Sequence, residues 1–182
     1  MSSRQETAAM IDKTVLLNEK AKELVETCKN SGVTLGFAES LTGGMISATV
    51  VNISGASAVF KGSIVSYTNQ IKENVLGVPA EIIEVHTEVS EACAEAMAVG
   101  AANVLGVDLA ISVTGIAGPT GELPGKPVGT VYMGYCYEGP DFFGTLTGSK
   151  RLNFEGDRDT IRTETVIAAL EQAIKLVKEG KA

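Results

Sequence analysis

The sequence predicts a three-layer α/β/α sandwich built on a mixed, mainly parallel sheet. Short apolar runs alternate with helical patterns along the chain. The hydrophobic content of 45% comes mainly from Ala, Val, Ile and Leu, with no Trp, which is typical of buried strands flanked by helices. At 182 residues the chain has the length of one domain. We expect residues 1–32 to form a tail and a helix packed on the domain, and residues 33–182 to form the domain itself.

The first elements follow from apolar spacing and from turn residues. The first ten residues look frayed, and residues 11–28 carry a helical pattern that Asn30, Ser31 and Gly32 end. Residues 34–38 are predicted as a strand. A helix is predicted to begin near Ser40 and to continue to residue 51, which makes a strand-turn-helix unit.

The middle of the chain predicts a second unit of this kind. Residues 63–67 form a strand after a loop with glycines, and residues 71–76 form a short helix that ends at Gly77. Ser90 stands where a helix N-cap is expected, and an Ala-rich helix follows to residue 105. A helix with such small side chains is able to pack closely against a sheet.

The last third predicts three strands and a final helix. The strands are apolar runs at residues 109–113, 128–137 and 142–152, the last of them antiparallel to its predecessor. The helix spans residues 157–178, with acidic residues at its start and lysines at its end, as the helix dipole favours.

Charge and hydropathy exclude several classes of partner. The formal net charge of −7 argues against direct nucleic acid binding, which needs clustered Lys and Arg, but leaves a small anionic ligand open. No apolar run approaches the ~18 residues of a membrane span, and the N-terminus lacks an apolar signal core. We therefore expect a cytoplasmic protein without a membrane partner.

The sequence offers no pattern for a metal or a disulfide framework. Cys28, Cys93 and Cys136 are odd in number and form no CxxC, so they are interpreted as small buried hydrophobes. His86 is the single histidine, so a Ser-His-Asp triad is formally possible but would rest on it alone. Glu39 has no second carboxylate at ligand spacing. We expect neither a metal nor a cofactor.

The turn after the first strand is a candidate nucleophile site. Ser40 is by default a helix cap. Two glycines in a first helical turn each weaken the helix by about 1 kcal/mol relative to alanine, which suggests close approach of a ligand or of backbone. The N–H groups of Thr42, Gly43 and Gly44 are then candidate oxyanion donors around a Ser40 nucleophile.

A serine that attacks an amide needs a base, and Lys72 is the candidate. With Tyr67 it follows the second strand, so both are expected at the edge where open α/β sheets bind ligands. A basic lysine requires a lowered pKa, which burial can supply. The ordinary alternatives are a solvated helix lysine and an unremarkable strand aromatic residue.

The Gly/Pro-rich segment after residue 113 is a candidate anion cradle. It matches neither a Walker A motif nor GxGxxG, so generic ATP or dinucleotide binding is unsupported. A nest of amides near a hydroxyl is able to hold a phosphate, and the candidates are Thr114, Gly115, Ile116, Ala117 and Gly118. Arg158, next to the predicted cap Asp157, is solvated by default but could pair with a phosphate, including one across a dimer interface.

Five ordered runs resemble one known family: AESLTGG, SYTNQIKENVLGV, VTGIAGPTG, GKPVGTVY and GDRD. They resemble the C-terminal domain of the CinA (competence/damage-inducible protein) family from about Val33 onward. The resemblance implies a stand-alone nicotinamide mononucleotide amidase with Ser40, Tyr67 and Lys72 as its catalytic set, the Gly-rich loop as nucleotide pocket, and a homodimer or higher homo-oligomer. The alternative is a non-catalytic nucleotide-sensing or protein-interaction module of the competence or DNA-damage response.

Overall fold

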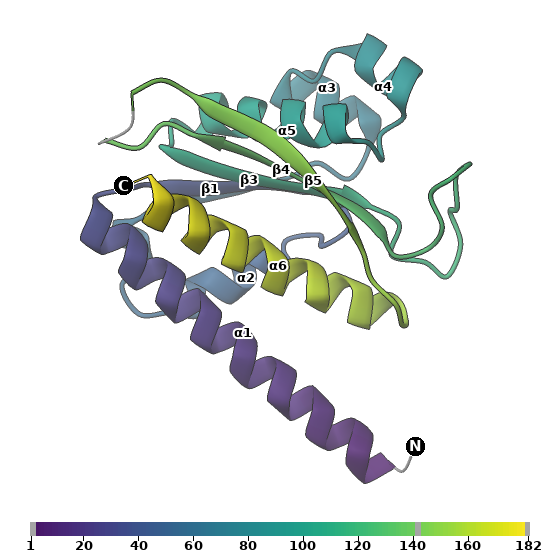
Figure 1. Ribbon diagram of the computed structural model, residues 1–182, viewed down its shortest axis with the longest axis horizontal. Helices are drawn as coiled ribbons and strands as arrows, with labels where there is room; N and C mark the ends of the chain where they lie inside the picture. The colour runs from purple at the N-terminus through teal and green to yellow at the C-terminus, as the bar shows by residue number, and fades with distance from the viewer. Residues whose placement is uncertain (1–2, 141–142, 181–182) are drawn as a thin grey trace.

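The computed structural model describes residues 3–140 and 143–180 (Figure 1). One sheet has the strand order β2-β1-β3-β4-β5. Its strands are β1 (Leu35–Glu39), β2 (Phe60–Val65), β3 (Leu109–Gly115), β4 (Thr130–Tyr137) and β5 (Leu146–Asn153). β1 is parallel to both of its neighbours, whereas β4 is antiparallel to β3 and β5. Four strands therefore run one way and β4 runs against them, which confirms the mixed, mainly parallel sheet.

Helices cover both faces of the sheet (Figure 1). One face carries α1 (Ser3–Ser31), α2 (Met45–Val51) and α6 (Arg158–Glu179). The other carries α3 (Asn69–Leu76), α4 (Ala80–His86) and α5 (Glu91–Leu105), and a short 3-10 helix (Ala56–Ala58) precedes β2. The three-layer α/β/α sandwich is therefore confirmed. None of the helices in the described ranges is both long enough and apolar enough to cross a membrane.

The two faces of the sheet bury side chains of different size. On the α1/α6 face, β1 buries Leu35 and Phe37 in the larger core. On the α5 face the strands present small residues such as Ala38 and Ala110. A Cβ added at Gly134 of β4 would lie 2.1 Å from a backbone oxygen of α5. This close approach confirms the tight helix–sheet contact that the Ala-rich sequence of α5 predicts.

Several predictions need correction. The second strand, predicted over residues 63–67, is β2 at Phe60–Val65, so Tyr67 lies after it. Helix α1 already includes residues 3–10, which were expected to be frayed, because this segment has neither Gly nor Pro to end a helix. Helix α2 begins at Met45 rather than near Ser40. His86, expected in a loop, is the last residue of α4.

Other predicted elements match closely. Ser90 caps α5 by accepting a hydrogen bond from the Cys93 N–H, and Asp157 caps α6 by accepting one from the Thr160 N–H. The predicted last strand was to begin at residue 142, which lies outside the described residues; the observed β5 begins at Leu146. The division of the chain at residue 32 stays a prediction, and α1 adds to the core the buried residues Ala21, Leu24, Val25 and Cys28.

Candidate active site

Loops that follow β1 and β3 meet at one edge of the sheet, because these neighbouring strands are parallel. They enclose a cavity of about 250 Å³. The predicted residues on its wall are Ser40, Tyr67, Lys72, Thr114, Gly115, Ile116, Ala117, Gly118 and Arg158. The wall also contains residues that sequence reasoning did not single out: Leu41, Glu88, Val89, Thr120 and Gly121.

Ser40 and Lys72 meet in the buried part of this cavity. Ser40 follows β1, and its N–H donates a 3.0 Å hydrogen bond to the Val113 carbonyl, which extends the pairing with β3. The Lys72 Nζ lies 3.2 Å from the Ser40 Oγ and donates a 2.8 Å bond to the Ser66 carbonyl. Ser40 is 8% exposed and Lys72 only 1%. The two atoms are within the hydrogen-bond distance that proton exchange requires.

Burial decides the protonation tendency of Lys72. Removal of the amine from water lowers its pKa from the ordinary value, while Cys93 and Glu88 act in the opposite direction. Burial also raises the pKa of the Cys93 thiol to about 11, so this neighbour is uncharged at neutral pH. The dominant effect favours the neutral amine, which has a lone pair to accept a proton.

Glu39 organises the loop that carries Ser40, although no sequence pattern assigned it a role. The carboxylate is fully buried at the N-terminus of α2. Its Oε2 accepts hydrogen bonds from the Thr42 hydroxyl and from the N–H groups of Gly44 and Ile46, at 2.8 to 3.0 Å. Its Oε1 accepts bonds from the Ser47 N–H and from the hydroxyls of Ser47 and Ser63, at 2.6 to 3.2 Å. These six contacts replace water and hold the loop against α2 and β2.

The predicted oxyanion donors are already used within the protein. The Gly43 N–H donates to the Ser40 carbonyl, and the Gly44 N–H donates to Glu39. Both glycines have a positive φ, of 61° and 97°, so the backbone conformation explains them without a ligand. Thr42 is buried and does not line the cavity. The N–H groups of Gly43 and Gly44 are therefore structural, and the prediction that they face a ligand is wrong.

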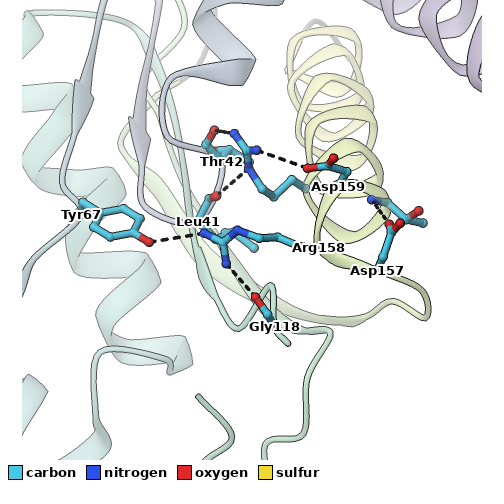
Figure 2. Close-up of polar contacts among 9 residues, drawn as sticks. Leu41, Thr42, Tyr67, Gly118, Asp157, Arg158 and Asp159 are labelled. Atoms are coloured by element: carbon cyan, nitrogen blue, oxygen red, sulfur yellow. Dashed lines mark hydrogen bonds and ion pairs between the residues drawn. The ribbon is translucent and has the colours of Figure 1, made fainter. Parts of the chain in front are cut away.

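Other amides of the same loop remain available. Within the described ranges, the N–H groups of Leu41 and Thr42 have no hydrogen-bond partner. Arg162 of α6 binds the carbonyls of both residues, at 3.1 and 2.9 Å (Figure 2). In a trans peptide the N–H points away from the C=O, so this clamp fixes the direction of the Thr42 N–H. Leu41 lines the cavity and follows the serine, where an oxyanion donor is useful.

Part of the second loop, which follows β3, also uses its polar groups for hydrogen bonds within the protein. The Ile116 N–H donates to the Thr130 carbonyl, and the Thr114 hydroxyl donates to the Glu88 carbonyl. These two groups therefore do not face a ligand, contrary to the predicted nest. The Ala117 and Gly118 N–H groups have no hydrogen-bond partner among the described residues, so only part of the predicted nest is available to an anion.

Arg158 reaches the cavity within its own chain. Its Nη1 donates a 2.8 Å bond to the Gly118 carbonyl, and its Nη2 lies 3.4 Å from the Tyr67 hydroxyl (Figure 2). Tyr67 is 61% exposed, and in the described structure its hydroxyl bonds to Arg158 rather than to Ser40 or Lys72. Arg158 and Tyr67 thus form a polar rim, with a guanidinium next to the two free amides.

The remaining candidates lie elsewhere. All three cysteines are buried and free, which confirms that they act as small hydrophobes. His86 is exposed and does not line the cavity, so the structure offers no support for a Ser-His-Asp triad. Across residues 3–140 and 143–180, no three His, Cys, Asp or Glu side chains gather as metal ligands would.

A profile of the CinA C-terminal domain matches residues 17–177, which includes half of α1 and the whole cavity. The chain belongs to this family. A CinA-like protein from Thermotoga maritima is 43% identical over 162 residues, covering 88% of this chain and 38% of that protein. A CinA-like protein from Citrifermentans bemidjiense is 48% identical over 143 residues, covering 79% of this chain and 33% of that protein. This CinA-type chain thus spans well under half of these relatives' length.

Solved structures of the family show the same fold. A CinA superfamily protein from Klebsiella pneumoniae superposes with a TM-score of 0.82 at 31% identity, covering 90% of this chain and 98% of that one. A competence/damage-inducible protein from Agrobacterium tumefaciens gives 0.81 at 35% identity, covering 88% and 95%. The resemblance that begins near Val33 in the sequence is therefore confirmed and extends into α1.

Replacement of Glu39 tests its role as organiser of the loop. In Glu39→Gln one carboxylate oxygen is replaced by an NH2 group, which is a donor. In one orientation of the amide this NH2 faces the backbone N–H groups of Gly44 and Ile46, and in the other it faces the N–H of Ser47, so at least one N–H loses its acceptor. We expect a loss of about 1–3 kcal/mol in the free energy of unfolding, measured by urea denaturation. The exposed Glu84→Gln should change it by less than about 0.5 kcal/mol. Equal stability of the two variants would contradict the role.

Proposed function

We propose that this CinA-type domain hydrolyses the carboxamide of nicotinamide mononucleotide to nicotinate mononucleotide and ammonia. The observation that carries the proposal is the buried Lys72 amine 3.2 Å from the Ser40 Oγ. A serine beside a neutral amine is a nucleophile with its base, and an amide is the kind of substrate that such a pair attacks. The family resemblance supplies the identity of the substrate.

Each step uses groups on the cavity wall. The neutral Lys72 Nζ accepts the hydroxyl proton as the Ser40 Oγ attacks the amide carbon. The Leu41 N–H, which is free and directly follows Ser40 in the chain, is the donor that we assign to the negative oxygen of the tetrahedral intermediate. The Lys72 ammonium then returns the proton to the leaving nitrogen, and ammonia departs. Water, deprotonated by the same amine, attacks the acyl carbon, and the Lys72 ammonium returns this proton to the Ser40 Oγ as the ester bond breaks and the carboxylate product forms.

The other end of the substrate fits the polar rim. The phosphate is a dianion, and the chain has a net charge of −7, so a broad positive field does not hold it. In this proposal the Arg158 guanidinium and the Ala117 and Gly118 amides bind the phosphate, and Tyr67 orients Arg158 through its hydroxyl. The proposal therefore separates chemistry at Ser40 from recognition at Arg158.

Removal of the nucleophile tests the chemistry directly. Ser40→Ala should lose nearly all ammonia release from nicotinamide mononucleotide and keep nucleotide binding, measured by a coupled ammonia assay and by calorimetry. Because Ser40 is not a helix cap in the structure, stability should fall by about 1 kcal/mol or less. The exposed Ser54→Ala is the matched control. Turnover above a few per cent in Ser40→Ala would refute the assignment, whereas a wild-type protein that binds nucleotide without turnover would favour the sensing module.

The pH dependence tests Lys72. The protonated amine cannot accept the serine proton, so the rate should be low at acidic pH and rise as Lys72 deprotonates. Since burial lowers the Lys72 pKa, this rise should lie below the value of about 10.4 for a free lysine. Lys72→Arg should be nearly inactive because a guanidinium stays charged, while the exposed Lys61→Arg should keep the wild-type profile. An active Lys72→Arg variant together with an inactive His86→Ala variant would instead identify His86 as the base.

Arg158 tests phosphate recognition. Arg158→Ala should raise the KM for nicotinamide mononucleotide by about 10- to 100-fold, as expected for loss of a charge-assisted hydrogen bond, and barely change the KM for the riboside. Arg151→Ala, which lies outside the cavity wall, is the control. Gly118→Val is unsuitable because its Cβ would lie 2.6 Å from the Val128 Cγ1. Equal wild-type efficiency on the nucleotide and the riboside would show that no phosphate site exists.

A further inference from the structure

The segment between α4 and α5 adopts a costly backbone conformation beside the cavity. Thr87 has a φ of +70° with a ψ of 165°, a region that β-branched residues rarely occupy. Contacts from two other side chains help to hold it there. The Lys126 Nζ donates to the Thr87 Oγ1 at 2.9 Å, and the Ser90 Oγ donates to the Thr87 carbonyl at 2.9 Å. The residue that follows Thr87 is thus presented from a fixed turn.

That residue is Glu88, and it lines the cavity. Its carbonyl accepts a 2.7 Å bond from the Thr114 hydroxyl at the end of β3, so both loops hold its backbone. Its carboxylate is close enough to Lys72 to raise the pKa of that amine against the larger effect of burial. Glu88 is half-buried, where a charge interacts more strongly than in open solvent.

The charged groups of the wall are Lys72, Glu88 and Arg158. When Lys72 is the neutral base, Glu88 carries the wall's negative charge and Arg158 its positive charge. Glu88 acts near Lys72, whereas Arg158 binds Gly118 and Tyr67. The cavity therefore offers a carboxylate near the nucleophile pair and a guanidinium at its rim.

This charge arrangement matches a zwitterionic ligand. In an oxidised pyridine nucleotide the ring that carries the carboxamide is a pyridinium cation, and the phosphate is an anion. A carboxamide placed at Ser40 brings this cationic ring beside Lys72 and therefore toward Glu88. The reduced dihydropyridine ring carries the same carboxamide but no positive charge.

We propose that Glu88 recognises the positive ring of the substrate and makes this domain selective for oxidised over reduced pyridine nucleotide amides. The inference rests on the proposed function, since it takes the carboxamide to Ser40. It assigns Glu88 as a determinant of specificity and leaves proton transfer to Lys72.

Binding without turnover tests the inference. In a Ser40→Ala background, calorimetry should show that nicotinamide mononucleotide binds about tenfold more tightly than its reduced form, as expected for one partly exposed charge interaction. Adding Glu88→Gln should abolish this preference by weakening the oxidised ligand alone. Adding the exposed Glu84→Gln should leave it intact. An equal loss for both ligands, or an unchanged preference in the Glu88→Gln protein, would overturn the proposal.

Turnover supplies a second readout that a purely structural role would not change. Lys72 is faced by Cys93 of α5 and by Glu88, with Arg158 and Tyr67 on the same cavity wall. Cys93 and Glu88 both oppose the lowering of the Lys72 pKa by burial, and Glu88→Gln removes the charge of Glu88. The rise in rate should therefore move to lower pH, and an unmoved rise would contradict the placement of this carboxylate beside Lys72, on which the proposal depends.

The two proposals fail separately. A binding preference that depends on Glu88 in a protein that releases no ammonia would sustain the inference and refute the amidase. Ammonia release together with a binding preference that Glu88→Gln does not change would sustain the amidase and refute the inference.

Discussion

The hydrogen bonds of the buried Glu39 carboxylate are the contacts on which the candidate site at the edge of the sheet depends. A carboxylate taken out of water is very costly unless hydrogen-bond donors replace the water. Here the loop after β1, the first turn of α2 and Ser63 of β2 supply six donors, and the start of a helix also favours the negative charge. Because these donors converge only in one backbone path, Ser40 is held in one place at the end of β1.

Lys72 is also a buried ionisable group, but it has far fewer hydrogen-bond partners than Glu39. Within the described structure its amine has two oxygen partners, the Ser66 carbonyl and the Ser40 hydroxyl, and burial lowers its pKa. Glu39 has many partners and a structural role, whereas Lys72 has few partners and a tendency to lose its charge. The same edge of the sheet thus holds a rigid acidic support and a potential base, which differ in how completely the protein replaces water.

The sequence predicted the parts of this arrangement that depend on local pattern. Periodicity located the strands, and polar caps located the starts of α5 and α6, because these signals act within a few residues. The start of α2 was misplaced because Gly43 and Gly44 take positive φ values that delay the helix, and because Glu39 rather than Ser40 caps it. The Arg162 clamp on Leu41 and Thr42 joins residues about 120 positions apart, which no local pattern reveals.

Hydrogen bonding within the fold also decides which backbone groups are left for a ligand. Gly43, Gly44 and Ile116 looked like ligand donors in the sequence, but the loops use their N–H groups to stay closed. Among the described residues, free donors remain at Leu41 and Thr42 in one loop, and at Ala117, Gly118, Thr120 and Gly121 in the other. The same wall carries the guanidinium of Arg158 and the carboxylate of Glu88. In the proposed function, the sign and placement of charge on the ligand therefore determine what the cavity accepts.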